Sequence, residues 1–394
     1  MADVIRSDGA RLLKRYRPSK EQFRVLNELA KCRTAALGGH LKQCDTCSRE
    51  IPVYNSCRNR HCPKCQGAAR SEWLEARERE VLDVQYFHVV FTLPHELAPL
   101  ALQNRRAVYS MLFRAASETL TTLARDPKYL GAELGCLALL HTWGQNLLLH
   151  PHLHCVIPGG GLSADGERWV SCRDGFFLPV RVISRLFRGK FIALLQRAYD
   201  KGELEFFGRL QHLSHPNAWD GWLDALRNKP WVVYAKPPFG GPRQVLKYLA
   251  RYTHRVAIAN SRIISADDSK VTFRWKDYAN ANQQRIMTLD AVEFLRRFLL
   301  HVLPKGFMRV RYYGFLANRH RQEKLARIRR LLGQPETLDN DSSDSVTCVD
   351  ADEQEPTTDS VDLCPECRKG RLRTIAPLPA KPVLFRDSWS FDSS

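Results

Sequence analysis

The sequence predicts an α+β protein in which a small metal-binding module precedes a larger domain built on a β-sheet. Eight cysteine and histidine residues gather between Cys32 and Cys65, near the N-terminus. Further along, runs of β-branched and aromatic residues, typical of strands, alternate with longer stretches at helical spacing. We therefore expect a helical arm and metal-binding domain at 1–83, a sheet domain at 84–334, and an acidic disordered linker with a C-terminal CxxC tail at 335–394.

The charge of the chain is basic and unevenly spread. Among 394 residues, 60 are Lys or Arg and 42 are Asp or Glu, which gives a formal net charge of +18. The stretch Glu336–Asp362 holds ten acidic and no basic residues, so the remainder carries +28. A field of that size favours a polyanion, and nucleic acid is the partner that we expect. The alternative is a basic surface that only aids solubility.

No apolar run is long enough to span a membrane, and the N-terminus lacks the apolar core of a signal peptide. We therefore expect a cytoplasmic protein with no membrane partner. The chain up to Lys31 is expected to be helical, with Ser19 as a helix N-cap. The sequence leaves open whether the chain forms a homo-oligomer.

The cysteine-rich segment predicts structural zinc. One CxxC pair begins at Cys44 and the next at Cys62, a separation typical of a four-thiolate site, and we expect one zinc ion on Cys44, Cys47, Cys62 and Cys65. A second, interleaved zinc site is expected on Cys32, His40, Cys57 and His61. In a reducing compartment these residues indicate metal ligands rather than disulfides, and the remaining alternative is buried free thiols.

Basic residues lie between these ligands and could face DNA: Arg58, Arg60 and Lys64. The elements expected in the sheet domain follow in chain order. They are a strand at 86–93, a helical region at 96–125, strands at 135–142, 152–158 and from 169, a helical region at 179–228, a strand at 230–236, a hairpin at 262–276, a helix at 290–303, a strand at 305–316 and a basic helix at 319–330.

The stretch His152-Leu153-His154 is the first chemical signal of the sheet domain. Side chains two residues apart in a strand point the same way, so both imidazoles leave one face while Leu153 enters the core. A third ligand from a neighbouring segment would complete a metal site with open positions. We prefer Gln145, seven residues before His152, which a hairpin could bring to the same face; His141 is the second choice.

A pair of tyrosines is the second chemical signal. Tyr248 and Tyr252 are four residues apart in an expected helix, so both phenols leave the same face. Such a face usually packs in a core. Three basic residues that could contact DNA interleave with the pair, and together with a histidine pair in a basic chain they favour a nucleophilic role: Lys247, Arg251 and Arg255.

Taken in order, these motifs resemble the two-tyrosine HUH transposases of bacterial insertion sequences, the IS91 family. The resemblance rests on four segments and covers residues from about 20 to 330: Tyr54–Gln66, His150–Cys155, Tyr248–Arg255 and Lys305–Leu316. It implies an HUH endonuclease core, with the histidine pair on a central strand of a mostly antiparallel sheet and the tyrosines on a facing helix. It also implies rolling-circle transposition through single-stranded DNA in the bacterial cytoplasm, at the nucleoid.

The resemblance implies that His152 and His154 bind a catalytic divalent ion, Mg²⁺ or Mn²⁺. It also implies that Tyr248 and Tyr252 are the nucleophiles. The third ligand is not fixed by the match. A plasmid or phage replication initiator or relaxase would carry the same site, although the zinc module favours a transposase. A non-catalytic, zinc-dependent DNA-binding regulator is the alternative from another class.

Overall fold

The expected fold class is confirmed: the protein is α+β, with an antiparallel central sheet flanked by helices. We analysed a computed structural model of the chain. The residues that it describes are 1–66, 80–175, 177–236, 257–277, 280, 283–334 and 363–381.

The central sheet has seven strands in the order β7-β6-β4-β5-β3-β8, with β12 paired to β4. Every described pairing in it is antiparallel. Its strands are β3 (Tyr86–Thr92), β4 (Glu133–Trp143), β5 (Leu149–Pro158), β6 (Gly160–Leu162), β7 (Trp169–Ser171), β8 (Val233–Lys236) and β12 (Val310–Gly314). The two longest, β4 and β5, form a hairpin at its centre.

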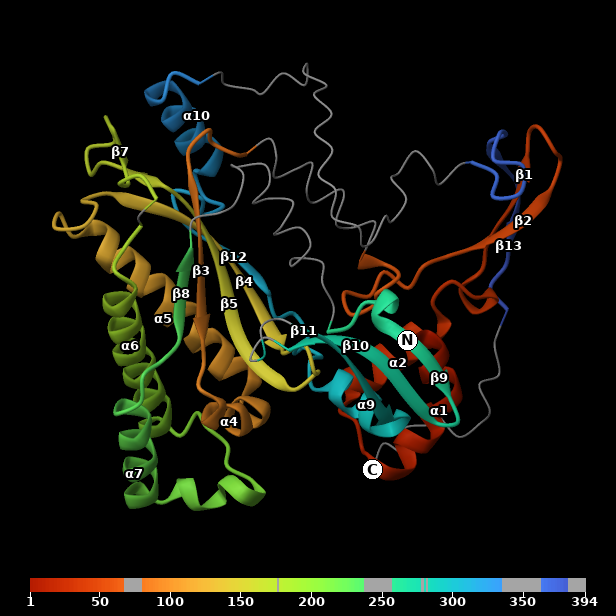
Figure 1. Ribbon diagram of the computed structural model, residues 1–394, viewed down its shortest axis with the longest axis horizontal. Helices are drawn as coiled ribbons and strands as arrows, with labels where there is room; N and C mark the ends of the chain where they lie inside the picture. The colour runs from red at the N-terminus through yellow and green to blue at the C-terminus, as the bar shows by residue number, and fades with distance from the viewer. Residues whose placement is uncertain are drawn as a thin grey trace.

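Helices cover one face of this sheet (Figure 1). They are α4 (Ala98–Gln103), α5 (Arg105–Arg125), α6 (Val180–Asp200) and α7 (Pro216–Arg227), with short 3₁₀ turns at His95–Leu97 and Gly208–Ser214. Leu153, Cys155 and Ile157 of β5 point into the helix-covered core. Because side chains alternate along a strand, His152 and His154 leave the opposite face.

A second body holds the N-terminal helices α1 (Ala2–Arg15) and α2 (Lys20–Lys31) together with a three-stranded sheet and α9 (Ala291–Leu299). The expected cap at Ser19 is confirmed, since the Ser19 side chain accepts from the Gln22 amide. The sheet strands are β9 (Ile263–Asp267), β10 (Lys270–Asp277) and β11 (Gln283–Asp290). One hydrophobic core unites these elements, so residues 4–32 pack with residues 257–302 across the boundary that we expected at residue 83.

The third sheet joins the two ends of the chain. Strands β1 (Gly39–Cys44) and β2 (Glu50–Tyr54) form a hairpin, and β13 (Leu372–Leu378) pairs with β1 on its other edge. Figure 1 shows this sheet extending away from the two larger bodies. The part of the chain predicted as a CxxC tail thus contributes a strand to the N-terminal region. The remaining elements are the 3₁₀ turns Ala35–Leu37 and Asn260–Arg262 and helix α10 (Arg321–Leu331).

The tyrosine pair at 248 and 252 and the basic residues around it lie outside the described residues. Within the ranges that are described, no helix is both long and apolar enough to cross a membrane.

Candidate functional site

Three histidines meet on the sheet face opposite the helices. His141 of β4 stands directly across from His152 of β5, and His154 lies two residues further along β5. One ring nitrogen from each residue can be chosen so that all three lie within 4.8 Å of one another. The ring centroids of His141 and His154 are 4.6 Å apart, and those of His152 and His154 are 4.9 Å apart. This is a compact set of nitrogen donors on two rigid strands.

Gln145, our preferred third ligand, is not on a strand beside these three histidines. Strand β4 continues to Trp143, so Gln145 lies in the turn beyond it, whereas His141 is the residue that the register sets opposite His152. The turn is docked on the second body, where Leu147 is 0% exposed. Three consecutive backbone carbonyls of this turn, those of residues 145, 146 and 147, accept hydrogen bonds from Arg262, Arg297 and His301.

A fourth histidine, which was not among the predicted ligands, supports the set. His88 of β3 lies on the same face, and its Nε2 is 2.8 Å from Nδ1 of His154. With the His154 Nδ1–H donating to His88, Nε2 of His154 carries the lone pair that a metal needs. The alternation of side chains along β3 could have pointed to His88. Phe87, Val89 and Phe91 face the core, so His88 lies on the other face of the strand.

The protonation states of these histidines suit metal binding. Burial lowers the pKa of His152 to about 4 and that of His88 to about 4, so both imidazoles are neutral at neutral pH. Nδ1 of His152 is 2.6 Å from the carbonyl oxygen of His150. A carbonyl can only accept, so this nitrogen donates and Nε2 is left as the metal-binding atom. The donor set therefore fits a divalent cation.

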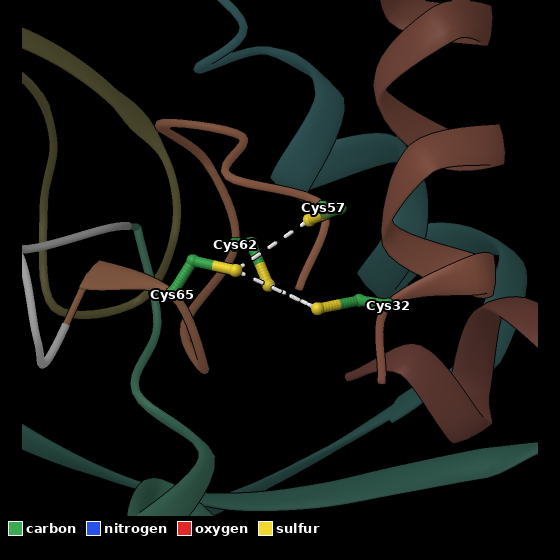
Figure 2. Close-up of side chains that lie close together, drawn as sticks. All are labelled: Cys32, Cys57, Cys62 and Cys65. Atoms are coloured by element: carbon green, nitrogen blue, oxygen red, sulfur yellow. Dashed lines mark hydrogen bonds between the residues drawn. The ribbon is translucent and has the colours of Figure 1, made fainter. Parts of the chain in front are cut away.

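Four cysteines form a separate cluster at the end of α2 (Figure 2). They are Cys32, Cys57, Cys62 and Cys65, and their sulfur atoms all lie within 4.8 Å of one another. The Cys32–Cys65 and Cys57–Cys65 sulfurs are 3.5 and 3.7 Å apart. A tetrahedral zinc with Zn–S bonds of about 2.3 Å requires edges of about 3.8 Å. Hydrogen bonds from neighbouring thiols, led by Cys57, lower the pKa of Cys32, whereas the contacts with Cys32 raise the pKa of Cys57 and Cys62.

The predicted grouping of the zinc ligands was therefore wrong. Cys62 and Cys65 pair with Cys32 and Cys57, and not with the other CxxC pair, because the loop after β2 returns to the end of α2. Cys44 and Cys47 lie instead beside Cys364 and Cys367. Neither expected histidine ligand takes part: His40 is exposed on β1, and His61 is buried outside both clusters.

The basic residues that we expected to contact DNA are not equally accessible in the structure. Arg60 donates to the carbonyl oxygens of Phe307 and Pro304 at 2.7 and 3.0 Å, so it fastens the zinc-cluster loop to the sheet domain instead of facing DNA. Arg58 is exposed and Lys64 is half-buried, and their role in DNA binding stays a prediction. Lys247, Arg251 and Arg255 lie outside the described residues.

Comparisons with known proteins settle the family. Residues 4–93 match a family model described as "Transposase zinc-binding domain", and residues 135–324 match one described as "Putative transposase". The chain is 53% identical over 376 residues to "Putative transposase y4qJ" of Sinorhizobium fredii, covering 95% of this chain and 94% of that protein. The chain belongs to the IS91 family of transposases.

A second relative of this transposase is the "Transposase for insertion sequence element IS801" of Pseudomonas savastanoi pv. phaseolicola. It is 28% identical over 306 residues, which cover 76% of this chain and 71% of that protein. The solved structures that match include two of the conjugative relaxase TrwC in complex with oriT DNA. The metal-bound one covers 60% of this chain with a TM-score of 0.25 and 12% identity, and the metal-free one 42% with 0.24 and 15%.

Family membership confirms the resemblance inferred from the motifs and makes DNA the partner of this transposase. The match of residues 4–93 to a zinc-binding domain agrees with the cysteine clusters, which fit structural zinc. The cluster at the end of α2 lies wholly within that match.

Proposed function

We propose that this transposase nicks and rejoins single-stranded DNA through a 5′-phosphotyrosine intermediate during rolling-circle transposition of an insertion sequence. The observation that carries the proposal is the set of three histidines, His141, His152 and His154, on the two central strands. A transposase needs a phosphoryl-transfer site, and among the described residues this is the one histidine cluster arranged for metal binding. Family membership supports the assignment.

The three imidazoles would hold one divalent cation and leave positions on it open to DNA. When bound, the cation polarises the scissile phosphate and stabilises charge on its oxygens. The resemblance implies Mg²⁺ or Mn²⁺. Imidazole nitrogens suit transition metals better than Mg²⁺, which prefers oxygen ligands, so an all-nitrogen donor set favours Mn²⁺ of the two.

Tyr248 and Tyr252 are the proposed nucleophiles. A tyrosine phenol has an ordinary pKa of about 10, and the nearby Lys247, Arg251 and Arg255 in the sequence would favour its phenolate. The phenolate oxygen bonds to phosphorus as the bond from phosphorus to the 3′ oxygen breaks, and that oxygen takes up a proton. The phosphotyrosine conserves the bond energy, so attack by a 3′-OH can rejoin the DNA without ATP.

A covalent-adduct assay tests the proposal. Full-length protein is incubated with labelled single-stranded DNA from the element end and Mn²⁺, and the products are separated on a denaturing gel. We expect a protein–DNA adduct that is lost on chelation and in the Tyr248→Phe/Tyr252→Phe double variant. An adduct that persists in the double variant, or no adduct with any divalent metal, contradicts the proposal. The second result would favour a non-catalytic DNA-binding regulator.

A second assay separates a transposase reaction from that of a replication initiator with the same site. A marked element is placed on a donor plasmid, and its movement to a target plasmid is scored with the wild type and with the tyrosine double variant. Movement that depends on the tyrosines supports transposition. Adduct formation without movement of any marked element indicates a replication role.

A further inference from the structure

We propose that Cys44, Cys47, Cys364 and Cys367 form a second zinc site that fastens the C-terminal segment to the N-terminal module within one chain. The four sulfur atoms lie within 4.8 Å of one another. The Cys44–Cys367 and Cys47–Cys364 sulfurs are each 3.7 Å apart. That separation is close to the edge of about 3.8 Å expected for a tetrathiolate zinc. It is much longer than a disulfide bond of about 2.05 Å.

The two CxxC turns have the backbone arrangement of zinc knuckles. The amides of Thr46 and Cys47 point at Sγ of Cys44, at 3.4 and 3.5 Å. In the C-terminal turn the amide of Gly370 points at Sγ of Cys367, at 3.4 Å. Amide donors aimed at sulfur stabilise a thiolate, which is the form that binds zinc.

Backbone pairing independently brings the two turns together. Strands β1 and β13 pair from Gly39–Leu378 to Cys44–Leu372. Beyond the end of β1, the Asp45 amide donates to the carbonyl oxygen of Arg371 at 3.0 Å, and the Arg371 amide donates to Oδ1 of Asp45 at 2.8 Å. The ladder thus aligns the cysteines of both turns.

Gly370 fits only because it has no side chain. A Cβ built on it would lie 2.4 Å from Sγ of Cys44 and 2.5 Å from Oγ1 of Thr46, closer than atoms can approach. The C-terminal turn is therefore shaped to pack directly against the N-terminal one. Such close packing is expected of two halves of one zinc ribbon.

The sheet that these turns join has little other means of stability. Most side chains of β1, β2 and β13 are exposed or half-buried. A small sheet without a hydrophobic core needs a metal or a disulfide to hold it. The remaining described cysteines, Cys136, Cys155 and Cys172, lie in the sheet domain outside both clusters.

Zinc stoichiometry tests the inference on the full-length protein. Zinc per chain is measured by mass spectrometry of metals, and the molar mass of the same fraction by light scattering. Every protein compared carries His152→Ala and His154→Ala, so that zinc in the histidine site is not counted. We expect two zinc ions per monomeric chain with all cysteines intact and one in the Cys364→Ser/Cys367→Ser variant. Cys172→Ser is the matched control and should keep two. One zinc with all cysteines intact, two in the cysteine double variant, or a second zinc found only in dimers would overturn the proposal.

A second measurement on the wild type guards against a variant that fails to fold. Zinc is withdrawn stepwise with a chelator while backbone amide exchange is followed. We expect release of one zinc to expose the amides of β13 and β1 while those of β4 and β5 stay protected. Unchanged protection of β13 after both zinc ions are lost would contradict a metal clamp. This readout does not depend on nuclease activity, so it fails or succeeds independently of the proposed function.

Discussion

Replacing the third imidazole of the proposed metal site tests how the β4–β5 hairpin builds that site. His141 is 2% exposed and stands across from His152, whereas Gln145 lies in the hairpin turn. We compare His141→Ala with Gln145→Ala, and add His88→Ala because His88 reaches the metal centre through its contact with His154. The structure predicts three different losses of metal affinity.

The magnitudes follow from the position of each side chain. Losing a residue that orients a metal ligand typically weakens metal binding about 10- to 100-fold, and this range is expected for His88→Ala. Losing a ligand itself should cost more, so His141→Ala is expected to exceed about 100-fold, or about 2.7 kcal/mol. Gln145→Ala should change the affinity by only about twofold, as substitutions outside a site usually do.

Calorimetric titration of Mn²⁺ into metal-free protein at neutral pH gives these affinities. His212→Ala is the matched control, because His212 is an exposed imidazole in the 3₁₀ turn Gly208–Ser214 and lies on no strand of the sheet. Denaturant unfolding of each variant separates lost ligands from lost folding. If Gln145→Ala weakened Mn²⁺ binding as much as His141→Ala, the assignment from the hairpin register would be refuted.

Three further predictions concern other parts of the chain. Arg60→Ala should lower the free energy of unfolding by about 2 kcal/mol, because charged hydrogen bonds to two carbonyls are lost. Arg58→Ala, at an exposed site, should change it by less than about 0.5 kcal/mol. Equal effects of the two substitutions in urea unfolding would contradict this prediction. Burial lowers the pKa of His301 to about 4, so between about pH 6.5 and about pH 4 the unfolded chain binds a proton that the folded chain does not. The free energy of unfolding should therefore fall with falling pH by up to about 3 kcal/mol. His301→Gln should remove that part of the pH dependence, and an unchanged dependence would refute the prediction. Gly370→Ala should reduce bound zinc to about one ion per chain. Gly189→Ala, where nothing lies within 4 Å of the new Cβ, should keep two zinc ions. If both variants kept two zinc ions per chain, the close packing around Gly370 would not matter for the site.

The sequence predicted the two strands of the central hairpin because their physical signals are local. The β-branched and aromatic runs indicated β3, β4 and β5, and alternation along β5 put His152 and His154 on one face. The third position of the proposed metal site depended on the register between β4 and β5. Placing Gln145 instead of His141 opposite His152 would shift the β4–β5 register by four residues. No local pattern marks Trp143 as the end of β4.

The zinc ligands show where reasoning from spacing fails. The presence of two CxxC pairs predicted thiolate sites, but spacing within a pair does not determine which pair it meets. Cys32 reaches its partners because α2 ends beside the loop after β2, and Cys44 reaches its partners through a strand near the opposite end of the chain. Both pairings depend on the tertiary structure and leave no mark in the local sequence. His88 was missed for a related reason, since its role requires knowing that β3 lies next to β5.

The separation of Cys44 and Cys367 by 323 residues has a consequence for how the protein is made. During synthesis the N-terminal zinc cluster can fill as soon as Cys65 has emerged, but the ribbon must wait until nearly the whole chain has been translated. Closing a loop of that length costs about 5 kcal/mol of chain entropy, unless the domains between its ends have already folded and shortened it. The ribbon is therefore expected to form last, and a chain that stops before Cys364 would have no means of forming it.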